Sequence, residues 1–101
     1  MIKISYKTKD NNILELKVLG HAELEEDCEL SVVCACVSSI VIGGLNAIND
    51  DTNYNMNVKS GDVEVYVNKI NSNDNVVLTT IIRQLETLKN KYSKSISIKK
   101  E

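Results

Sequence analysis

The residues that could do chemistry are concentrated in one stretch, residues 20–39, which reads GHAELEEDCELSVVCACVSS. This stretch holds the only histidine, His21, and all three cysteines, Cys28, Cys34 and Cys36. A cysteine thiolate is a strong nucleophile, and a histidine beside it can act as its general base. Acyl transfer through a cysteine is therefore the first chemistry to consider, with Cys34 and His21 as the pair.

The expected local structure around Cys34 favours a reactive thiol. Ser31 is the last residue of a preferred N-cap type before a long run without charges, which predicts a helix from Ser31 to about Ile48. Cys34 would then occupy the third helical position, where unpaired backbone N–H groups and the helix dipole favour the thiolate. The same N–H groups could hold an oxyanion, and Ser38, one turn beyond Cys34, would share its face of the helix.

A structural explanation of the same residues competes with the catalytic one. A cysteine at the start of a buried helix is usually a small core residue, and a histidine before a loop is usually a polar strand end. The loop of residues 22–30 carries five acidic side chains, which form either a solvated face or a lid that attracts a basic substrate segment. Cys28 in this loop is expected to be an incidental thiol, because neighbouring carboxylates disfavour the thiolate.

A zinc site made of His21, Cys28, Cys34 and Cys36 is a further alternative, and geometry argues against it. Residues two apart on a helix point to nearly opposite sides, so Cys34 and Cys36 cannot both bind one ion while the helix holds. The sequence also lacks a Cys-x-x-Cys pair. We therefore expect no metal and no other cofactor, and we expect Cys36 to fill space in the core.

The elements that must position these residues can be predicted from apolar periodicity. Alternating apolar residues at Ile2–Tyr6 and Leu14–Val18 predict one β-hairpin. A second alternation at Tyr54–Val58 and Val63–Val67 predicts another, with its turn marked by Gly61. His21 would follow the second strand of the first hairpin, where a rigid sheet can aim a side chain.

Two helices and a short strand complete the expected elements. The helix of residues 31–48 is apolar on nearly every side, and Gly43-Gly44 should permit close packing against another element. A second helix, capped by Ser72-Asn73-Asp74, has an apolar stripe from Val77 to Tyr92. Alternation at Ile96 and Ile98 indicates a last strand.

The order ββαββαβ over residues 1–101 predicts a single α+β domain with a largely antiparallel sheet of about five strands and two helices packed on it. A net charge of -2 gives no general reason to expect binding to nucleic acid or to an anionic membrane. The first helix falls short of the roughly 20 apolar residues that span a bilayer. An odd number of cysteines and no secretory start favour a cytoplasmic location.

The order of residues around Cys34 resembles that of the ribosomal-processing cysteine protease family (Prp). The family pattern is a Gly-His-small triplet, a loop of about a dozen residues and a helix that opens Asp-x-Val-Cys-Ala-Ala-Val-Ser. This chain has Gly20-His21-Ala22, and residues 31–38 read Ser-Val-Val-Cys-Ala-Cys-Val-Ser. The resemblance implies a catalytic pair of Cys34 and His21, with Gly20, Ser31 and Ser38 in supporting positions.

The family's Asp is Ser31 in this chain, which leaves the third member of the site open. Ser31 can cap a helix, but it cannot serve as a fixed anion that orients His21. Glu29 or Asp27 could take that role, or a dyad of cysteine and histidine could suffice. The resemblance covers essentially the whole chain.

The resemblance implies a cysteine endopeptidase that removes the N-terminal extension of a large-subunit ribosomal protein. The implied partner is that precursor, the implied assembly is a homodimer, and no direct binding to nucleic acid or membrane is expected. The alternative is a non-catalytic ribosome-associated module whose acidic loop binds a basic ribosomal tail and whose cysteines belong to the core.

Overall fold

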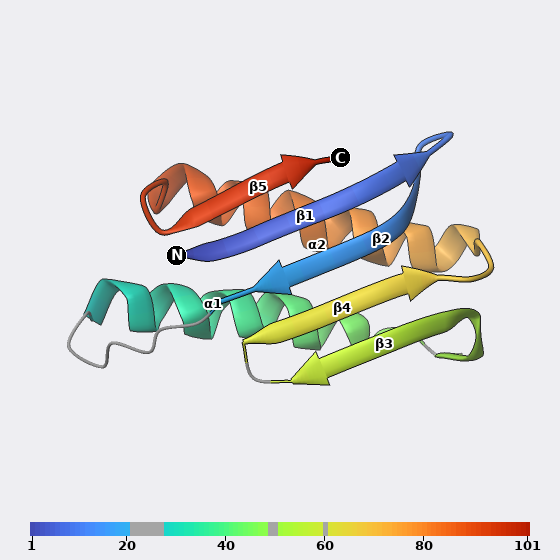
Figure 1. Cartoon of the computed structure of the whole chain (residues 1–101), viewed down its shortest axis with the longest axis horizontal. Coiled ribbons are helices and arrows are strands. Elements are labelled where there is room, and N and C mark those ends of the chain that lie inside the picture. Colours follow the sequence, from blue (N-terminus) through green and yellow to red (C-terminus); the bar gives the residue numbers. More distant parts are fainter. Residues whose placement is uncertain (21–27, 49–50, 60) are drawn as a thin grey trace.

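The computed structural model of the chain describes residues 1–20, 28–48, 51–59 and 61–101. Its helices and main strands follow the order ββαββαβ that the sequence predicts (Figure 1). In chain order they are β1 (Ile2–Lys9), β2 (Asn12–Leu19), α1 (Cys28–Leu45), the short 3-10 helix η1 (Asp51–Asn53), β3 (Tyr54–Lys59), β4 (Asp62–Val67), α2 (Ser72–Lys91) and β5 (Ile96–Lys100).

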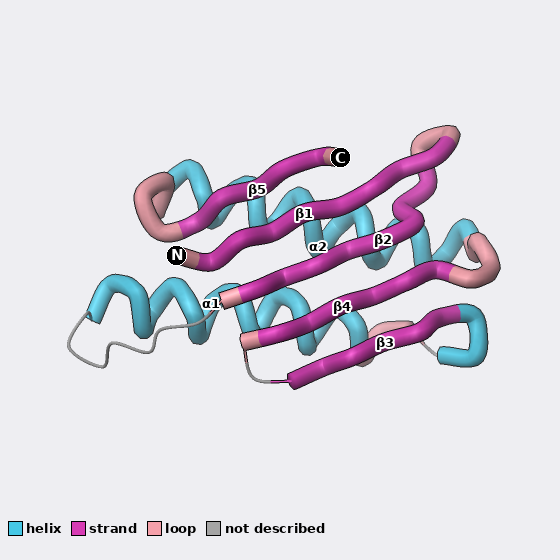
Figure 2. The backbone as a smooth tube through the Cα atoms, in the orientation of Figure 1, coloured by secondary structure: helices cyan, strands magenta, loops and turns pink. Residues whose placement is uncertain are grey.

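The five strands form one sheet in the order β3-β4-β2-β1-β5 (Figure 2). The pairs β1–β2, β2–β4 and β3–β4 are antiparallel, whereas β1 and β5 are parallel. The prediction of a largely antiparallel sheet is therefore confirmed. Because β2 pairs with β4, the end of β2 at Leu19 lies directly beside the start of β4 at Asp62.

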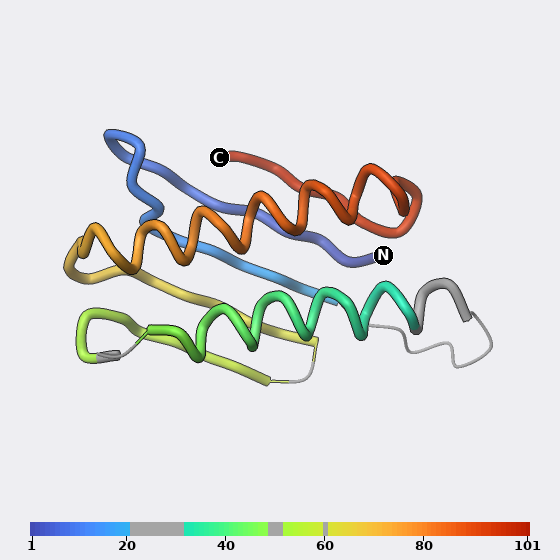
Figure 3. The backbone as a smooth tube through the Cα atoms, turned by 180° about the vertical axis from the view of Figure 1, so that it is seen from behind, coloured from blue at the N-terminus to red at the C-terminus, as the bar shows by residue number. Residues whose placement is uncertain are grey.

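Both helices cover the same face of the sheet, as the view from behind shows (Figure 3). Most of the buried strand residues are the apolar members of each predicted alternation, in keeping with a period of two. In β2, however, Ile13 is buried in place of the predicted Leu14, and the register of β1 and β2 shifts between Lys7 and Thr8. Val58, the last apolar residue of β3, is 47% exposed. The side chains with the least exposure come from the sheet and from both helices: Ile2, Ile4, Leu16, Leu78, Ile81, Leu85, Ile96, Val33, Val41 and Val65.

The opposite face of the sheet is polar, and several of its charges are paired. Lys17 Nζ lies 3.0 Å from Glu15 Oε1, and Lys7 Nζ lies 3.3 Å from Glu15 Oε2. The hydrogen bond from Lys17 is the largest cause that holds the pKa of Glu15 below its usual range. Ion pairs between lysine and glutamate at a sheet surface are typical of a solvated face and contribute little to stability.

The start of α1 differs from the prediction, because the helix begins at Cys28 rather than at Ser31. Glutamate and leucine, the residue types at positions 29 and 30, both favour a helix. Ser31 is therefore inside the helix and is not its N-cap. The regular helix also ends earlier than predicted, at Leu45, although turn bonds such as Ile48 N–H to the Leu45 carbonyl at 3.1 Å continue the chain to Ile48.

The cap of α2 also differs by one residue from the prediction. Asn71 has extended backbone angles, and its Oδ1 accepts hydrogen bonds from the N–H groups of Asn73 at 2.9 Å and Asp74 at 3.2 Å. Asn71 is thus the N-cap, and Ser72 is the first helical residue. Four consecutive residues of cap-forming type made the position ambiguous in the sequence.

We expect Asn71→Ala to lower the free energy of unfolding by about 1 kcal/mol, because two N–H groups lose their acceptor. The control is Ser72→Ala, one residue further along, which should change stability by less than about 0.5 kcal/mol. Chemical denaturation of both variants measures the difference. A larger loss in Ser72→Ala than in Asn71→Ala would contradict this assignment of the cap.

The close packing predicted for Gly43-Gly44 is real at only one of the two residues. A Cβ on Gly44 would overlap Cγ1 of Ile81, a buried residue of α2, whereas a Cβ on Gly43 would meet nothing within 4 Å. The absent side chain at Gly44 therefore allows α1 to approach α2. Gly43 is an exposed helical glycine without this role.

The pair gives a matched test of this packing. Gly43→Ala should stabilise the protein by up to about 1 kcal/mol, because alanine favours the helix. Gly44→Ala gains the same propensity but must displace Ile81, and overpacking of this kind costs about 1–3 kcal/mol. Thermal unfolding should therefore rank Gly43→Ala above the parent and Gly44→Ala below it. Equal shifts in the two variants would show that α1 and α2 adjust without strain.

Candidate active site

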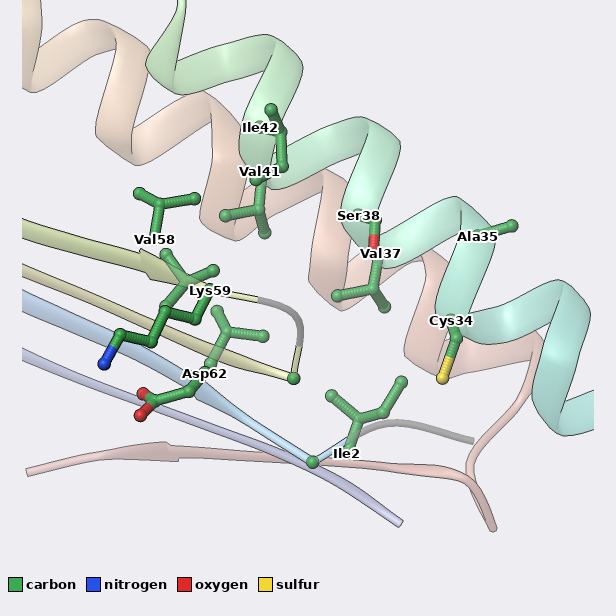
Figure 4. Close-up of a pocket in the computed structure, with 14 residues that line it drawn as sticks. Ile2, Cys34, Ala35, Val37, Ser38, Val41, Ile42, Val58, Lys59 and Asp62 are labelled. Carbon is green, nitrogen blue, oxygen red and sulfur yellow. The ribbon is translucent and has the colours of Figure 1, made fainter. Parts of the chain in front are cut away.

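Cys34 lies on the side of α1 that is turned toward the sheet (Figure 4). Its side chain is half-buried and packs against the core, to which Val37 and Val41 belong. Val37 and Val41 follow Cys34 by three and seven residues, so all three lie on one side of the helix. The packing that buries the two valines therefore also turns the Cys34 thiol toward the sheet.

A groove of about 490 Å³ opens beneath α1 at Cys34. The helix contributes Cys34, Ala35, Val37, Ser38, Val41 and Ile42, and the sheet side contributes Ile2, Val18, Gly20, Val58, Lys59, Gly61, Asp62 and Val63. Most of these side chains are apolar, and the thiol is at one end of the row along the helix. A nucleophile in the wall of such a groove can meet a carbonyl of a bound peptide.

Three residues singled out in the sequence line this groove together: Gly20, Cys34 and Ser38. Ser38 lies one helical turn beyond Cys34, where its hydroxyl can reach a bound chain. His21 and four of the acidic residues, Glu23, Glu25, Glu26 and Asp27, lie outside the described residues. The pairing of His21 with Cys34 therefore stays a prediction.

Gly20 holds a defined place at the end of β2. Its φ of 99° is in the region that favours glycine, and its N–H donates to the Gly61 carbonyl at 2.9 Å. A Cβ on Gly20 would lie 2.6 Å from the Met1 carbonyl oxygen. The chain therefore leaves β2 toward His21 through a position that accepts no side chain without rearrangement.

The start of α1 at Cys28 corrects the reason for expecting a reactive Cys34. Cys34 lies six residues after Cys28, beyond the first turn that carries the unpaired N–H groups. The unpaired N–H groups at the start of the helix are therefore too far from Cys34 to activate its thiol by the predicted route or to hold an oxyanion there. Ser31 loses its predicted role as the cap for the same reason.

Cys36 faces a different groove, which lies between α1 and α2 and is also lined by Ile40 and Leu88. Its separation from Cys34 agrees with the expectation that residues two apart on a helix diverge. Cys36 is half-buried and is not among the residues that form the core or pack against it, so the prediction that it fills space in the core is wrong. Within residues 1–20, 28–48, 51–59 and 61–101, no three His, Cys, Asp or Glu side chains are placed to hold a metal ion. In the same ranges, neither helix is long and apolar enough to span a membrane.

The sequence did not reveal that the β3–β4 hairpin forms part of the groove. Alternation placed Val58 and Val63 on the buried face, and Gly61 marked the turn. The alternation could not predict that β4 pairs with β2, and this pairing brings Gly61 beside Gly20 and beneath α1. Sheet order depends on contacts distant in sequence, and local periodicity does not encode them.

The family model described as cysteine protease Prp matches residues 1–97. Among solved structures, the chain is similar to an essential ribosomal processing protease Prp from S. aureus in complex with a covalently linked product peptide, with 23% identity, full coverage of both chains and a TM-score of 0.85. The complex of a Prp from S. aureus with a substrate peptide gives 21% identity, full coverage of both chains and a TM-score of 0.83. The protein SMU.848 from Streptococcus mutans gives 16% identity over 99% of this chain and 93% of that chain, with a TM-score of 0.81.

No curated protein matches this chain. The likeness to the solved structures supports the fold, and the family follows from the family model, which spans 97 of the 101 residues. The cysteine in the wall of the groove is consistent with this assignment. The chain belongs to the cysteine protease Prp family.

Proposed function

We propose that this protease is an endopeptidase that removes the N-terminal extension of a large-subunit ribosomal protein, with Cys34 as nucleophile and His21 as base and acid. The observation that carries the proposal is the placement of Cys34 in a groove open to a peptide. A related protein from S. aureus, described as a ribosomal processing protease, has been solved with substrate and product peptides. That description supports ribosomal processing as the role, and the N-terminal extension of a large-subunit protein is the substrate that the family resemblance implies.

The proposed chemistry is acyl transfer in two steps. His21 accepts the thiol proton of Cys34, the thiolate sulfur bonds to the peptide carbonyl carbon, and the C–N bond breaks as His21 returns the proton to the leaving amine. Water then attacks the thioester with His21 as base, which releases the new carboxylate and restores the thiol. Ser38 can donate a hydrogen bond to the bound peptide from the same wall of the groove.

The proposal also includes a cytoplasmic homodimer with no direct contact to nucleic acid or membrane. The feature that favours a dimer is α1, which has no charged residue after Glu29 and leaves Val32 and Ile42 exposed at 50% and 37%. Exposed apolar side chains on an uncharged helix are typical of contact surfaces. Sedimentation of the purified protein tests this assembly.

The deciding experiment is incubation of the protein with a synthetic peptide that spans the processing site of the ribosomal precursor. Mass spectrometry should find two products from one internal cut, and His21→Ala should remove this cleavage while the variant stays folded. Binding without cleavage would favour a non-catalytic ribosome-associated module. Cleavage by His21→Ala at the parent rate would remove His21 from the mechanism.

A further inference from the structure

The basic residues of the chain are gathered on one side of the fold. Residues 1–20 and 83–101 hold only four acidic residues, Asp10, Glu15, Glu86 and Glu101. The same segments hold ten of the twelve basic residues: Lys3, Lys7, Lys9, Lys17, Arg83, Lys89, Lys91, Lys94, Lys99 and Lys100. They form β1, β2, the second half of α2 and β5, and β1 and β5 lie side by side at one edge of the sheet (Figure 1). The net charge of -2 therefore conceals a basic edge.

β5 is the last strand at this edge, so one side of its backbone is open to pairing (Figure 2). Ile2 N–H donates to the Ser95 carbonyl at 2.9 Å, and Glu101 N–H donates to the Tyr6 carbonyl at 2.8 Å. Every second residue from Ser95 to Glu101 therefore bonds to β1, and the alternate residues turn their N–H and carbonyl groups to the open side. These alternate residues are Ile96, Ile98 and Lys100.

The side chains along this edge are basic on one face. Lys99 pairs in register with Ser5 of β1, and Lys3 lies two residues before Ser5 on the same face. Lys3, Lys99 and Lys100 are exposed, and none of the three forms an ion pair with another described residue. Their ammonium groups are therefore available to a partner.

The face of the edge that is turned toward α2 is apolar. Ile98 of β5 and Tyr92 at the end of α2 are half-buried and pack against the core. A strand added beside β5 would therefore have basic neighbours on one face and apolar neighbours on the other. Because side chains alternate along a strand, this edge suits a segment in which acidic and apolar residues alternate.

We infer that β5 is a docking edge for an extended acidic segment of another protein, which joins the sheet as an additional strand. The backbone of this segment pairs with Ile96, Ile98 and Lys100, as in other cases of strand addition at a sheet edge. Its carboxylates meet the lysines of β5 and β1. The inference goes beyond the proposed function and is independent of it, because no residue of β5 lines the groove at Cys34.

Two other occupants fit this edge less well. The edge strands of a second copy are β3 and β5, and these contain Lys59, Lys99 and Lys100 but no acidic residue, so lysine would face lysine. RNA has phosphates for the lysines but no peptide backbone that can pair with β5. Glu15 and Glu101 also lie among the lysines of this side and would repel a continuous row of phosphates.

The binding test uses the full chain and a fluorescent eight-residue peptide of alternating glutamate and valine, followed by anisotropy. One control peptide replaces every glutamate by lysine. A second replaces every valine by proline, which keeps the charge but removes backbone N–H groups. The parent peptide should bind at least about tenfold more tightly than either control. Equal binding of the proline peptide, or tighter binding of a short RNA duplex than of the parent peptide, would overturn the inference.

Variants of the edge separate the contribution of charge from that of the backbone. Lys99→Glu should weaken binding about tenfold, because attraction becomes repulsion, whereas Lys69→Glu makes the same change at an exposed lysine before α2 and should have no effect. Lys100→Pro removes an N–H that β1 does not use, and it should bind about fivefold more weakly than Lys100→Ala, which removes only the charge. Equal affinities of the Lys99 and Lys69 variants would contradict the assignment of the edge.

Amide hydrogen exchange, measured by NMR, shows where the peptide binds. The N–H groups of Ile98 and Lys100 should exchange at least about tenfold more slowly when the glutamate–valine peptide is bound. Those of Ser97 and Lys99 already bond to β1 and should change little. Protection confined to β3, or to residues that line the groove at Cys34, would show that the peptide docks elsewhere and would overturn the inference.

Discussion

Cys34→Ser is expected to lower kcat/KM for the precursor peptide by at least about 10⁴-fold. A serine hydroxyl is a weak nucleophile unless it is strongly activated, and a site built for a thiolate does not supply that activation. The substitution removes no methyl group from the core, so circular dichroism and the unfolding midpoint should stay close to those of the parent. Cleavage is measured by mass spectrometry of the peptide products over hours, which makes a small residual rate visible.

The controls for this prediction lie in the same stretch of sequence. Cys36→Ser makes the same chemical change two residues away, in the groove between α1 and α2, and should leave the cleavage rate within about twofold of the parent. Cys28→Ser should likewise leave the cleavage rate close to that of the parent. If Cys36→Ser loses as much cleavage as Cys34→Ser, the assignment of Cys34 as the nucleophile is contradicted. Cleavage at the parent rate by Cys34→Ser would exclude a covalent cysteine mechanism.

The secondary-structure order was predictable because each element carries its own period. The first hairpin also had a turn signal, since Asp10 and Asn11 adopt φ values of 53° and 66°, and these two residue types tolerate that region well. The stripe of α2 was equally clear, with Leu78, Ile81 and Leu85 at helical spacing and buried. Local chemistry decided all of these features.

The features that sequence could not place depend on where elements meet. Asn71 is the N-cap of α2, rather than one of the three polar residues that follow it, because Asn71 has extended backbone angles and the helix begins at the next residue. Gly44 rather than Gly43 contacts α2, which depends on the rotation of α1 about its axis. The groove beneath Cys34 needs the pairing of β2 with β4, so its second wall could not be derived from the pattern of either hairpin alone.

Gly20 is the described residue whose substitution should disturb both stability and the site. Alanine at a φ of 99° costs about 1–2 kcal/mol, because an L side chain meets its own backbone in this region. The new Cβ would also lie 2.6 Å from the Met1 carbonyl oxygen, and a backbone atom cannot move aside by changing a rotamer. Overpacking of this kind adds about 1–3 kcal/mol.

Gly20→Ala should therefore lower the free energy of unfolding by about 3.5 kcal/mol, the middle of the two summed ranges, as measured by chemical denaturation. Cleavage should fall by about a hundredfold even at a temperature where the variant is fully folded, because His21 follows directly and a displacement of about 1 Å in a catalytic group can have that effect.

Gly43→Ala is the control, since its Cβ meets nothing within 4 Å. If Gly20→Ala loses stability but cleaves at the parent rate per folded molecule, the tight contact with Met1 supports the sheet alone and does not position His21. If it loses cleavage while its stability is unchanged, the strain at Gly20 has been relieved by a shift of the chain that leads into the site.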